Sequence, residues 1–153
     1  MTSQREYLDR IDSVCPTPPS TDDLWNEVHD EVQQQLACLE TEVRRKLATV
    51  RVAAGRTTGS SFFLFSYRTF SLPDSGLDPV VAGLTFTPDG EGVRVEADVS
   101  GEQTGDLLAS WPSKTVAASR AELLAAVSEA ARLICQAADA VVVALGEKTR
   151  RVD

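Results

Sequence analysis

Apolar residues occupy every second position in two neighbouring stretches in the middle of the chain. Every second position is apolar over residues 80–86 and again over residues 93–99, and most of the positions between them are polar. The connecting sequence TPDGEG supplies the glycines that a tight hairpin turn favours. The pattern predicts an antiparallel hairpin with one apolar face and one face in contact with water.

Helical periodicity marks a long segment on either side of this hairpin. Over residues 21–54, apolar residues recur at steps of three and four: Leu24, Val28, Val32, Leu36, Leu39, Val43, Leu47 and Val50. Ser20 or Thr21 can cap this segment, and Gly55 can end it. Residues 119–146 repeat the spacing, start at the capping pair Ser119 and Glu122, and stop at Gly146. We therefore predict two long helices, over 21–54 and 119–146.

A strand rich in aromatic residues is expected at 61–72, but its apolar residues point to both faces. Four of these residues occupy even-numbered positions: Phe62, Leu64, Phe70 and Leu72. Three occupy odd-numbered positions: Phe63, Phe65 and Tyr67. Both sets cannot contact the same helix layer, because successive side chains of a strand point to opposite faces. Either a β-bulge reconciles the two sets, or one aromatic row lies on the second face. That row would form an interface, or the N-terminal arm with Tyr7, Leu8 and Ile11 would cover it.

The order of helix, strands and helix predicts a two-layer α+β domain. We expect an antiparallel meander of three or four strands over 61–111, the fourth being an edge strand that ends at Pro112. Both helices should pack on one face of this sheet. A length of 153 residues suits a single domain, 1–153, with an N-terminal arm over 1–19. No apolar run approaches the ~20 residues of a membrane span.

The chain is acidic, and the acids are unevenly distributed. Its 23 acidic and 15 basic residues give a net charge of −8. This balance disfavours nucleic acid and anionic membranes as partners. Between Thr69 and Ser113 there are eight acids and one base, Arg94. Solubility alone would explain such a segment, and so would a docking face for a basic protein. The candidate partner-binding residues are Glu96, Asp98, Trp111, Phe63, Phe65 and Tyr67.

Catalytic groupings and metal-ligand spacings are not found in the sequence. The one histidine, His29, has no nucleophile or second ligand among its helical neighbours, which favours a surface or capping role. Three cysteines at wide spacing indicate neither a disulfide framework nor a zinc site. We expect Cys38 and Cys135 to be small buried apolar residues, and Cys15 to be the more reactive thiol. No catalytic residue, metal or cofactor is predicted, and a reducing cytoplasm is the simplest location.

The function expected from these features is binding rather than catalysis. We predict an acidic chaperone, adaptor or immunity-type binder of a basic protein, acting as a monomer or a homodimer. In layout and charge the chain resembles small acidic α+β secretion chaperones, a likeness that involves no motif and no particular residue. The alternative is a small-molecule-binding domain or enzyme with a pocket between sheet and helices, where Arg68 and Arg94 would bind an anion. Thermal stabilisation by a ligand would distinguish the two.

Overall fold

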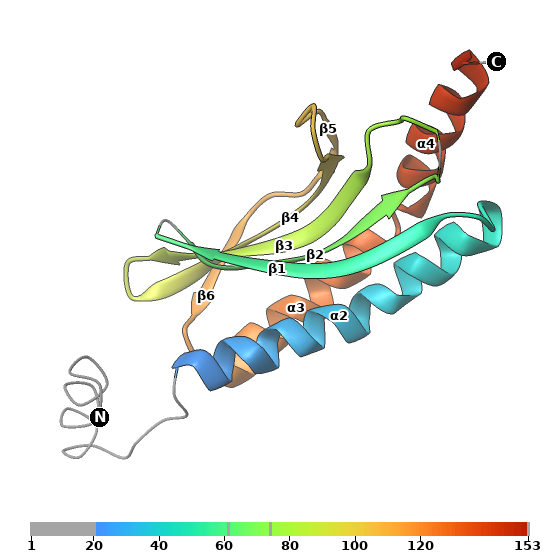
Figure 1. Ribbon diagram of the computed structural model, residues 1–153. Helices are drawn as coiled ribbons and strands as arrows, with labels where there is room; N and C mark the ends of the chain where they lie inside the picture. Colours follow the sequence, from blue (N-terminus) through green and yellow to red (C-terminus); the bar gives the residue numbers. More distant parts are fainter. Residues whose placement is uncertain (1–20, 61, 74, 153) are drawn as a thin grey trace, which may run out of the picture.

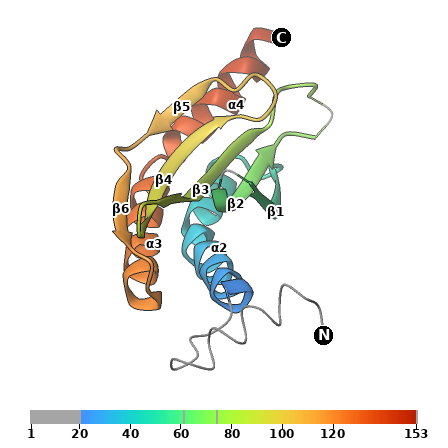
Figure 2. The same cartoon turned by 90° about the vertical axis from the view of Figure 1, so that its left-hand side faces the viewer.

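One antiparallel sheet carries helices on one of its faces (Figures 1 and 2). The structure is a computed structural model, and it describes residues 21–60, 62–73 and 75–152. Helix α2 spans Thr21–Lys46, α3 spans Arg120–Cys135 and α4 spans Ala138–Val152. The predicted α+β class is confirmed. The expected packing of residues 1–19 lies outside the described residues.

Six strands of the described residues form the sheet. They are β1 (Arg51–Gly59), β2 (Phe62–Ser71), β3 (Val80–Asp89), β4 (Gly92–Gly101), β5 (Leu107–Ser110) and β6 (Lys114–Ala117). The spatial order is β1-β2-β3-β4-β5, and β6 pairs with the other end of β4. The prediction of three or four strands is therefore too low, because β1 and β6 were not expected. Both β5 and β6 pair with β4, with Pro112 between them, where a residue without an N–H suits an interrupted edge.

The predicted hairpin is confirmed as β3 and β4. Asp89 pairs with Gly92 across a turn in which Gly90 has a φ of 63°. The side chains of the expected apolar face are buried: Val80, Ala82, Leu84, Phe86, Val93, Val95, Ala97 and Val99. They belong to the same buried core as the apolar stripe of α2, whose predicted members Val28, Val32, Leu36, Leu39 and Val43 are fully buried. The helix that lies against β3 and β4 is α3, whereas α2 lies mainly against β2.

The first helix ends at Lys46 rather than at residue 54. Three basic residues, Arg44, Arg45 and Lys46, occupy its last turn, where they complement the helix dipole. The N–H of Val50 then bonds the carbonyl of Leu47 at 3.0 Å in a tight turn, and β1 follows directly. The β-branched residues beyond this point favour a strand. Their apolar spacing also fits a helix, which is why the sequence prediction extended the helix to residue 54.

The predicted C-terminal helix divides in two. Its start is confirmed, since Ser119 accepts a hydrogen bond from the N–H of Glu122 at 3.3 Å. At the break, the N–H of Ala137 bonds the carbonyl of Ile134, three residues back, at 2.8 Å. Such a tight turn lets the chain change direction, and α4 then continues past Gly146, where the helix was expected to end.

A disulfide joins α2 to the last residue of α3, contrary to the sequence prediction. Cys38 and Cys135 are bonded, with a Cα–Cα distance of 6.1 Å and a sequence separation of 97. Cys38 is exposed rather than buried. The prediction failed because spacing along the chain does not reveal which helix faces meet after folding. The expected reducing compartment relied on unpaired cysteines, and this bond removes that support. Cys15 lies outside the described residues.

Helices capable of crossing a bilayer are absent from the described ranges, where none is both long and apolar enough.

Candidate functional site

The sheet face opposite the helices brings together four of the predicted partner-binding residues. We call it the helix-free face, because α2, α3 and α4 all lie on the other side of the sheet (Figures 1 and 2). Tyr67 of β2 pairs with Gly83 of β3, which pairs with Asp98 of β4. In the adjacent row, Phe65 pairs with Thr85, which pairs with Glu96. The aromatic pair on β2 and the carboxylate pair on β4 therefore lie on the same face, with β3 between them.

Two glycines let the aromatic rings lie flat on this face. Phe65 and Tyr67 stack with ring centroids 4.8 Å apart and planes 29° apart. A Cβ on Gly55, the β1 partner of Tyr67, would lie 2.6 Å from the phenol oxygen. A Cβ on Gly83 would lie 2.9 Å from the Phe65 ring. The Tyr67 ring thus extends over β1, and the Phe65 ring extends over β3 towards the carboxylates.

One carboxylate on the helix-free face, that of Asp98, is partly buried beside another negative charge. Burial raises the pKa of Asp98 above its usual range, and the neighbouring charge of Glu96 raises it further. Among the described residues, Asp98 has no ion-pair partner, whereas Glu96 has Arg94, whose Nε lies 3.4 Å from its carboxylate. The pair therefore retains a net negative charge, and a cation placed here would relieve the strain on Asp98.

Two other predicted partner-binding residues lie elsewhere. The expected bulge is present, since the β1–β2 register shifts between Thr57 and Gly59, and Phe63 stacks on Trp25 of α2 at 5.0 Å. Trp111 is half-buried against the helix layer, where it lines a small hollow of about 40 Å³ with Leu133 of α3. The aromatic row of β2 is thus divided: Phe63 turns towards α2, while Phe65 and Tyr67 remain on the helix-free face.

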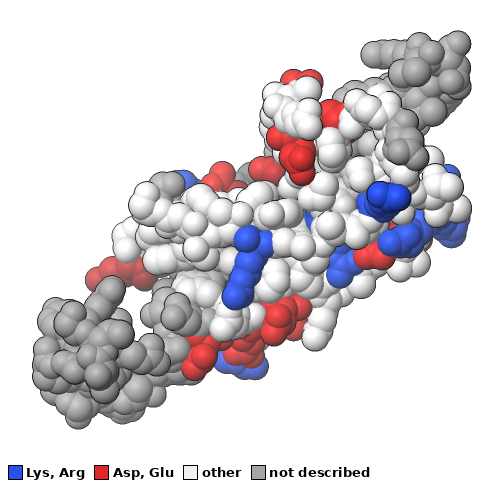
Figure 3. All heavy atoms as spheres, viewed as in Figure 1, with Lys and Arg blue, Asp and Glu red and all other residues white. Residues whose placement is uncertain are grey.

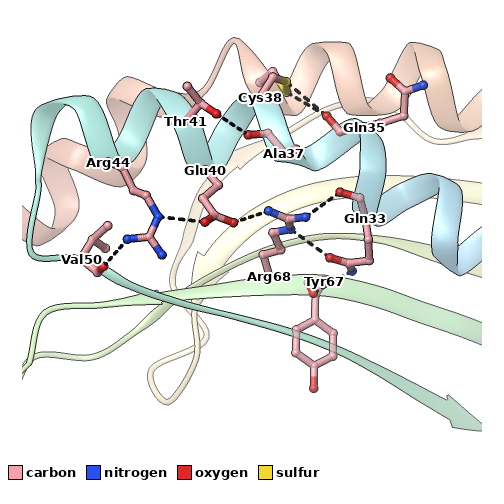
Figure 4. A network of polar contacts seen from close by, with 11 residues as sticks. Gln33, Gln35, Ala37, Cys38, Glu40, Thr41, Arg44, Val50, Tyr67 and Arg68 are labelled. Atoms are coloured by element: carbon pink, nitrogen blue, oxygen red, sulfur yellow. Dashed lines mark hydrogen bonds and ion pairs between the residues drawn. A yellow bond between two sulfur atoms is a disulfide. The ribbon is translucent and has the colours of Figure 1, made fainter.

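The candidate anion-binding residues Arg68 and Arg94 lie on opposite faces of the sheet. Arg68 points to α2, where its Nε donates to the side-chain oxygen of Gln33 at 2.9 Å and its Nη2 donates to the Gln33 carbonyl at 2.7 Å (Figure 4). Its Nη1 pairs with Glu40. The second oxygen of Glu40 accepts from Arg44, which also donates to the Val50 carbonyl. This network joins α2 to β2 and to the start of β1, so Arg68 is already engaged by the protein itself.

His29 takes part in a second polar contact between α2 and β2. Its Nδ1 lies 2.8 Å from the hydroxyl of Ser66, which also accepts from Gln33 at 3.2 Å. Burial lowers the pKa of His29, and the charge of Arg56 lowers it further, while Asp30 acts in the opposite sense. Ser66 is fully buried, so a substrate cannot reach its oxygen. The predicted surface or capping role of His29 is wrong: the residue satisfies a buried hydroxyl.

The acidic segment does not form one continuous surface. Asp78 accepts hydrogen bonds from Gln103 and Thr104 in the β4–β5 connection, and Asp89 accepts from Thr115 of β6. These acids organise turns at opposite ends of the sheet. In Figure 3, basic side chains gather where α2 ends and β1 begins, and acidic ones lie on the β4–β5 connection. Glu96 and Asp98 lie in the middle of β4 on the helix-free face, whereas Asp89 lies at the end of β3.

The part of the chain that the structure describes contains no cluster of histidine, cysteine or carboxylate side chains able to hold a metal ion. Comparison of the chain with protein-family models, curated proteins and solved structures gives no match.

Sequence reasoning missed Gly55, Gly83, Ser66 and Gln33. Ser66 had a usable signal, since a polar residue at the buried parity of a strand requires a partner. The two glycines were recognisable only once the strands were placed in register, because their role depends on rings from the neighbouring strand.

Proposed function

We propose that this chain is a non-catalytic protein-interaction domain, an acidic chaperone, adaptor or immunity-type binder, whose helix-free face takes up a basic segment of another protein. The observation that carries the proposal is the cross-strand arrangement of Phe65 and Tyr67 beside Glu96 and Asp98. Aromatic faces and carboxylates are the two groups that attract lysine and arginine side chains.

The shape of the face supports an extended, basic ligand. Gly83 is buried under the Phe65 ring, so that ring itself forms the surface that leads from the aromatic pair to the acidic pair. A lysine or arginine stem can lie over the Phe65 ring while its charged end reaches Asp98. Partner binding would then remove the repulsion between Glu96 and Asp98. The net charge of −8 would steer such a partner towards the protein at low ionic strength.

A defined probe tests this proposal. We would titrate the ¹⁵N-labelled protein with hexaarginine and follow amide chemical shifts, with hexaglutamine as the uncharged control. The expected shifts concentrate on Phe65, Tyr67, Gly83, Glu96 and Asp98, and they weaken as salt is added. Substituting Glu96→Gln and Asp98→Asn together should weaken binding about fivefold, since each exposed ion pair contributes ~0.2–1 kcal/mol.

The matched control carries Glu91→Gln and Asp106→Asn, which change the net charge equally but lie in the turns beyond β3 and β4. This variant should bind hexaarginine nearly as well as the unmodified protein. Equal weakening in both variants, or shifts spread evenly over all acidic loops, would show only a general attraction of an acidic protein for polycations and would overturn the proposal.

A further inference from the structure

A second concave site lies on the other side of the sheet, between α2 and the ends of β1 and β2. This hollow of about 560 Å³ is lined mainly by Trp25, Asn26, Arg56, Thr58, Phe62 and Phe63. Its volume is within the ~300–1,000 Å³ typical of small-molecule sites. It shares no residue with the helix-free face, so it is independent of the basic-segment proposal.

The β-bulge and the exposed end of β1 shape this hollow. The bulge turns Phe63 onto Trp25, where the rings stack with planes 25° apart, and Phe63 remains 37% exposed. Arg56 and Thr58 are exposed, and Arg56 points to the helix side, where it contacts Asn26. Gly59 contributes no side chain, and a Cβ there would lie 3.1 Å from the Phe62 ring. The aromatic wall of the hollow is therefore open to solvent.

One cation in the hollow lacks an acidic partner. Arg56 donates from Nη1 to the side-chain oxygen of Asn26 at 2.6 Å, and that neutral amide is its one hydrogen-bond partner among the described residues. By contrast, Arg44, Arg68 and Arg120 each form an ion pair. A guanidinium has five N–H donors, so most of those of Arg56 are available to a ligand. A neutral apolar ligand would shield this charge from water without replacing the lost interaction.

We propose that this hollow binds a planar aromatic carboxylate, with its ring against Trp25 and Phe63 and its carboxylate on Arg56. The planar fork of an arginine matches a carboxylate with two parallel hydrogen bonds. Because Trp25 and Phe63 stack on each other, the pair offers an outer ring face and ring edges, which suit offset or edge-to-face contact with an aromatic ring. Asn26 fixes one side of the guanidinium and thereby orients the free side towards the ligand.

Two-dimensional NMR tests this assignment directly, because the chain has two tryptophans. The probe is 2-naphthoate, and its neutral counterpart 2-naphthamide has nearly the same shape. We expect the indole N–H signal of Trp25 to shift saturably while that of Trp111 does not. Naphthoate should bind about tenfold more tightly than the amide, because a hydrogen bond to a charged group contributes ~1.5–3 kcal/mol.

The Arg56→Gln variant should reduce the affinity for naphthoate to that for the amide and leave the amide's affinity unchanged. Arg51→Gln, on the same strand but outside the hollow, is the matched control and should change neither. Three results would each overturn the proposal: no saturable shift of Trp25 at millimolar probe, equal affinity for the two probes in the unmodified protein, or undiminished naphthoate binding by Arg56→Gln.

Discussion

At the scale of single residues, the helix-free face depends on two glycines that tolerate substitution differently. Gly83 faces rigid groups, since a Cβ there would lie 2.6 Å from the Ser66 carbonyl oxygen and 2.7 Å from the Tyr67 Cβ. Gly55 faces only the end of the Tyr67 ring, which can rotate away. Adding a Cβ at Gly83 should therefore destabilise the fold more than adding one at Gly55.

We expect Gly83→Ala to lower the free energy of unfolding by ~1–3 kcal/mol, as overpacking typically does. Gly55→Ala should lower it by less than about 1 kcal/mol, because the ring moves and the strand loses a flexible residue. Urea unfolding followed by circular dichroism measures both. Equal losses of unfolding free energy in the two variants would mean that the backbone around Gly83 adjusts as easily as the Tyr67 side chain.

His29 should make stability depend on pH below about 6.5, the usual pKa of histidine in an unfolded chain. Its pKa is lowered in the folded protein, so the unfolded chain binds a proton more readily, and stability falls as the pH drops below the unfolded value of ~6.5. The raised pKa of Asp98 acts in the opposite sense, because protonation of that carboxyl favours the folded state. His29→Asn should flatten the stability profile between pH 7.5 and 5.5, as measured by urea unfolding at each pH. If stability changed with pH as much in this variant as in the unmodified protein, the pH dependence would come from groups other than His29.

At the scale of elements, the bond between Cys38 and Cys135 connects α2 to α3 across most of the chain. In the chain-entropy description, closing a loop of this size restricts the unfolded state by roughly 4–5 kcal/mol, and measured values are commonly ~2–4 kcal/mol. A tether between two helices of one layer also fixes their relative position on the sheet.

Reduction should therefore lower the thermal unfolding midpoint by several degrees. Thermal melts with and without a phosphine reductant would measure this effect. The double variant Cys38→Ser, Cys135→Ser should resemble the reduced protein and respond little to the reductant. A melting temperature that is unaffected by reductant in the unmodified protein would contradict a stabilising role for this bond.

Segments whose apolar pattern fits only one type of secondary structure were predicted correctly. Segments whose pattern fits both a helix and another structure were not. Apolar residues at every second position defined β3 and β4, and Ser119 marked the start of α3. The boundary between α2 and β1 was missed because Val50 and Val52 suit both a helical stripe and an alternating strand. The break before α4 was missed because alanine-rich sequence favours a helix on both sides, and a single tight turn leaves little trace in composition.

At the scale of the whole molecule, the two proposed sites differ in how far the sequence could reveal them. Phe65, Tyr67, Glu96 and Asp98 were each candidates, because aromatic and charged residues are conspicuous in a strand. Their placement in adjacent rows depends on the register of β2 against β3, which the connection over residues 72–79 does not encode in any simple pattern. The hollow around Arg56 was less accessible still, because β1 itself was not predicted.

The disulfide also determines how the molecule would respond to a pulling force. All six strands, from Arg51 to Ala117, lie between Cys38 and Cys135 along the chain. Tension applied at the two ends would pass through the covalent bond between the helices and bypass the sheet. The oxidised protein would then extend only through the segments outside the bond, while β1 to β6 remained mechanically unloaded. Reduction would convert this shielded sheet into the part of the molecule that bears the load.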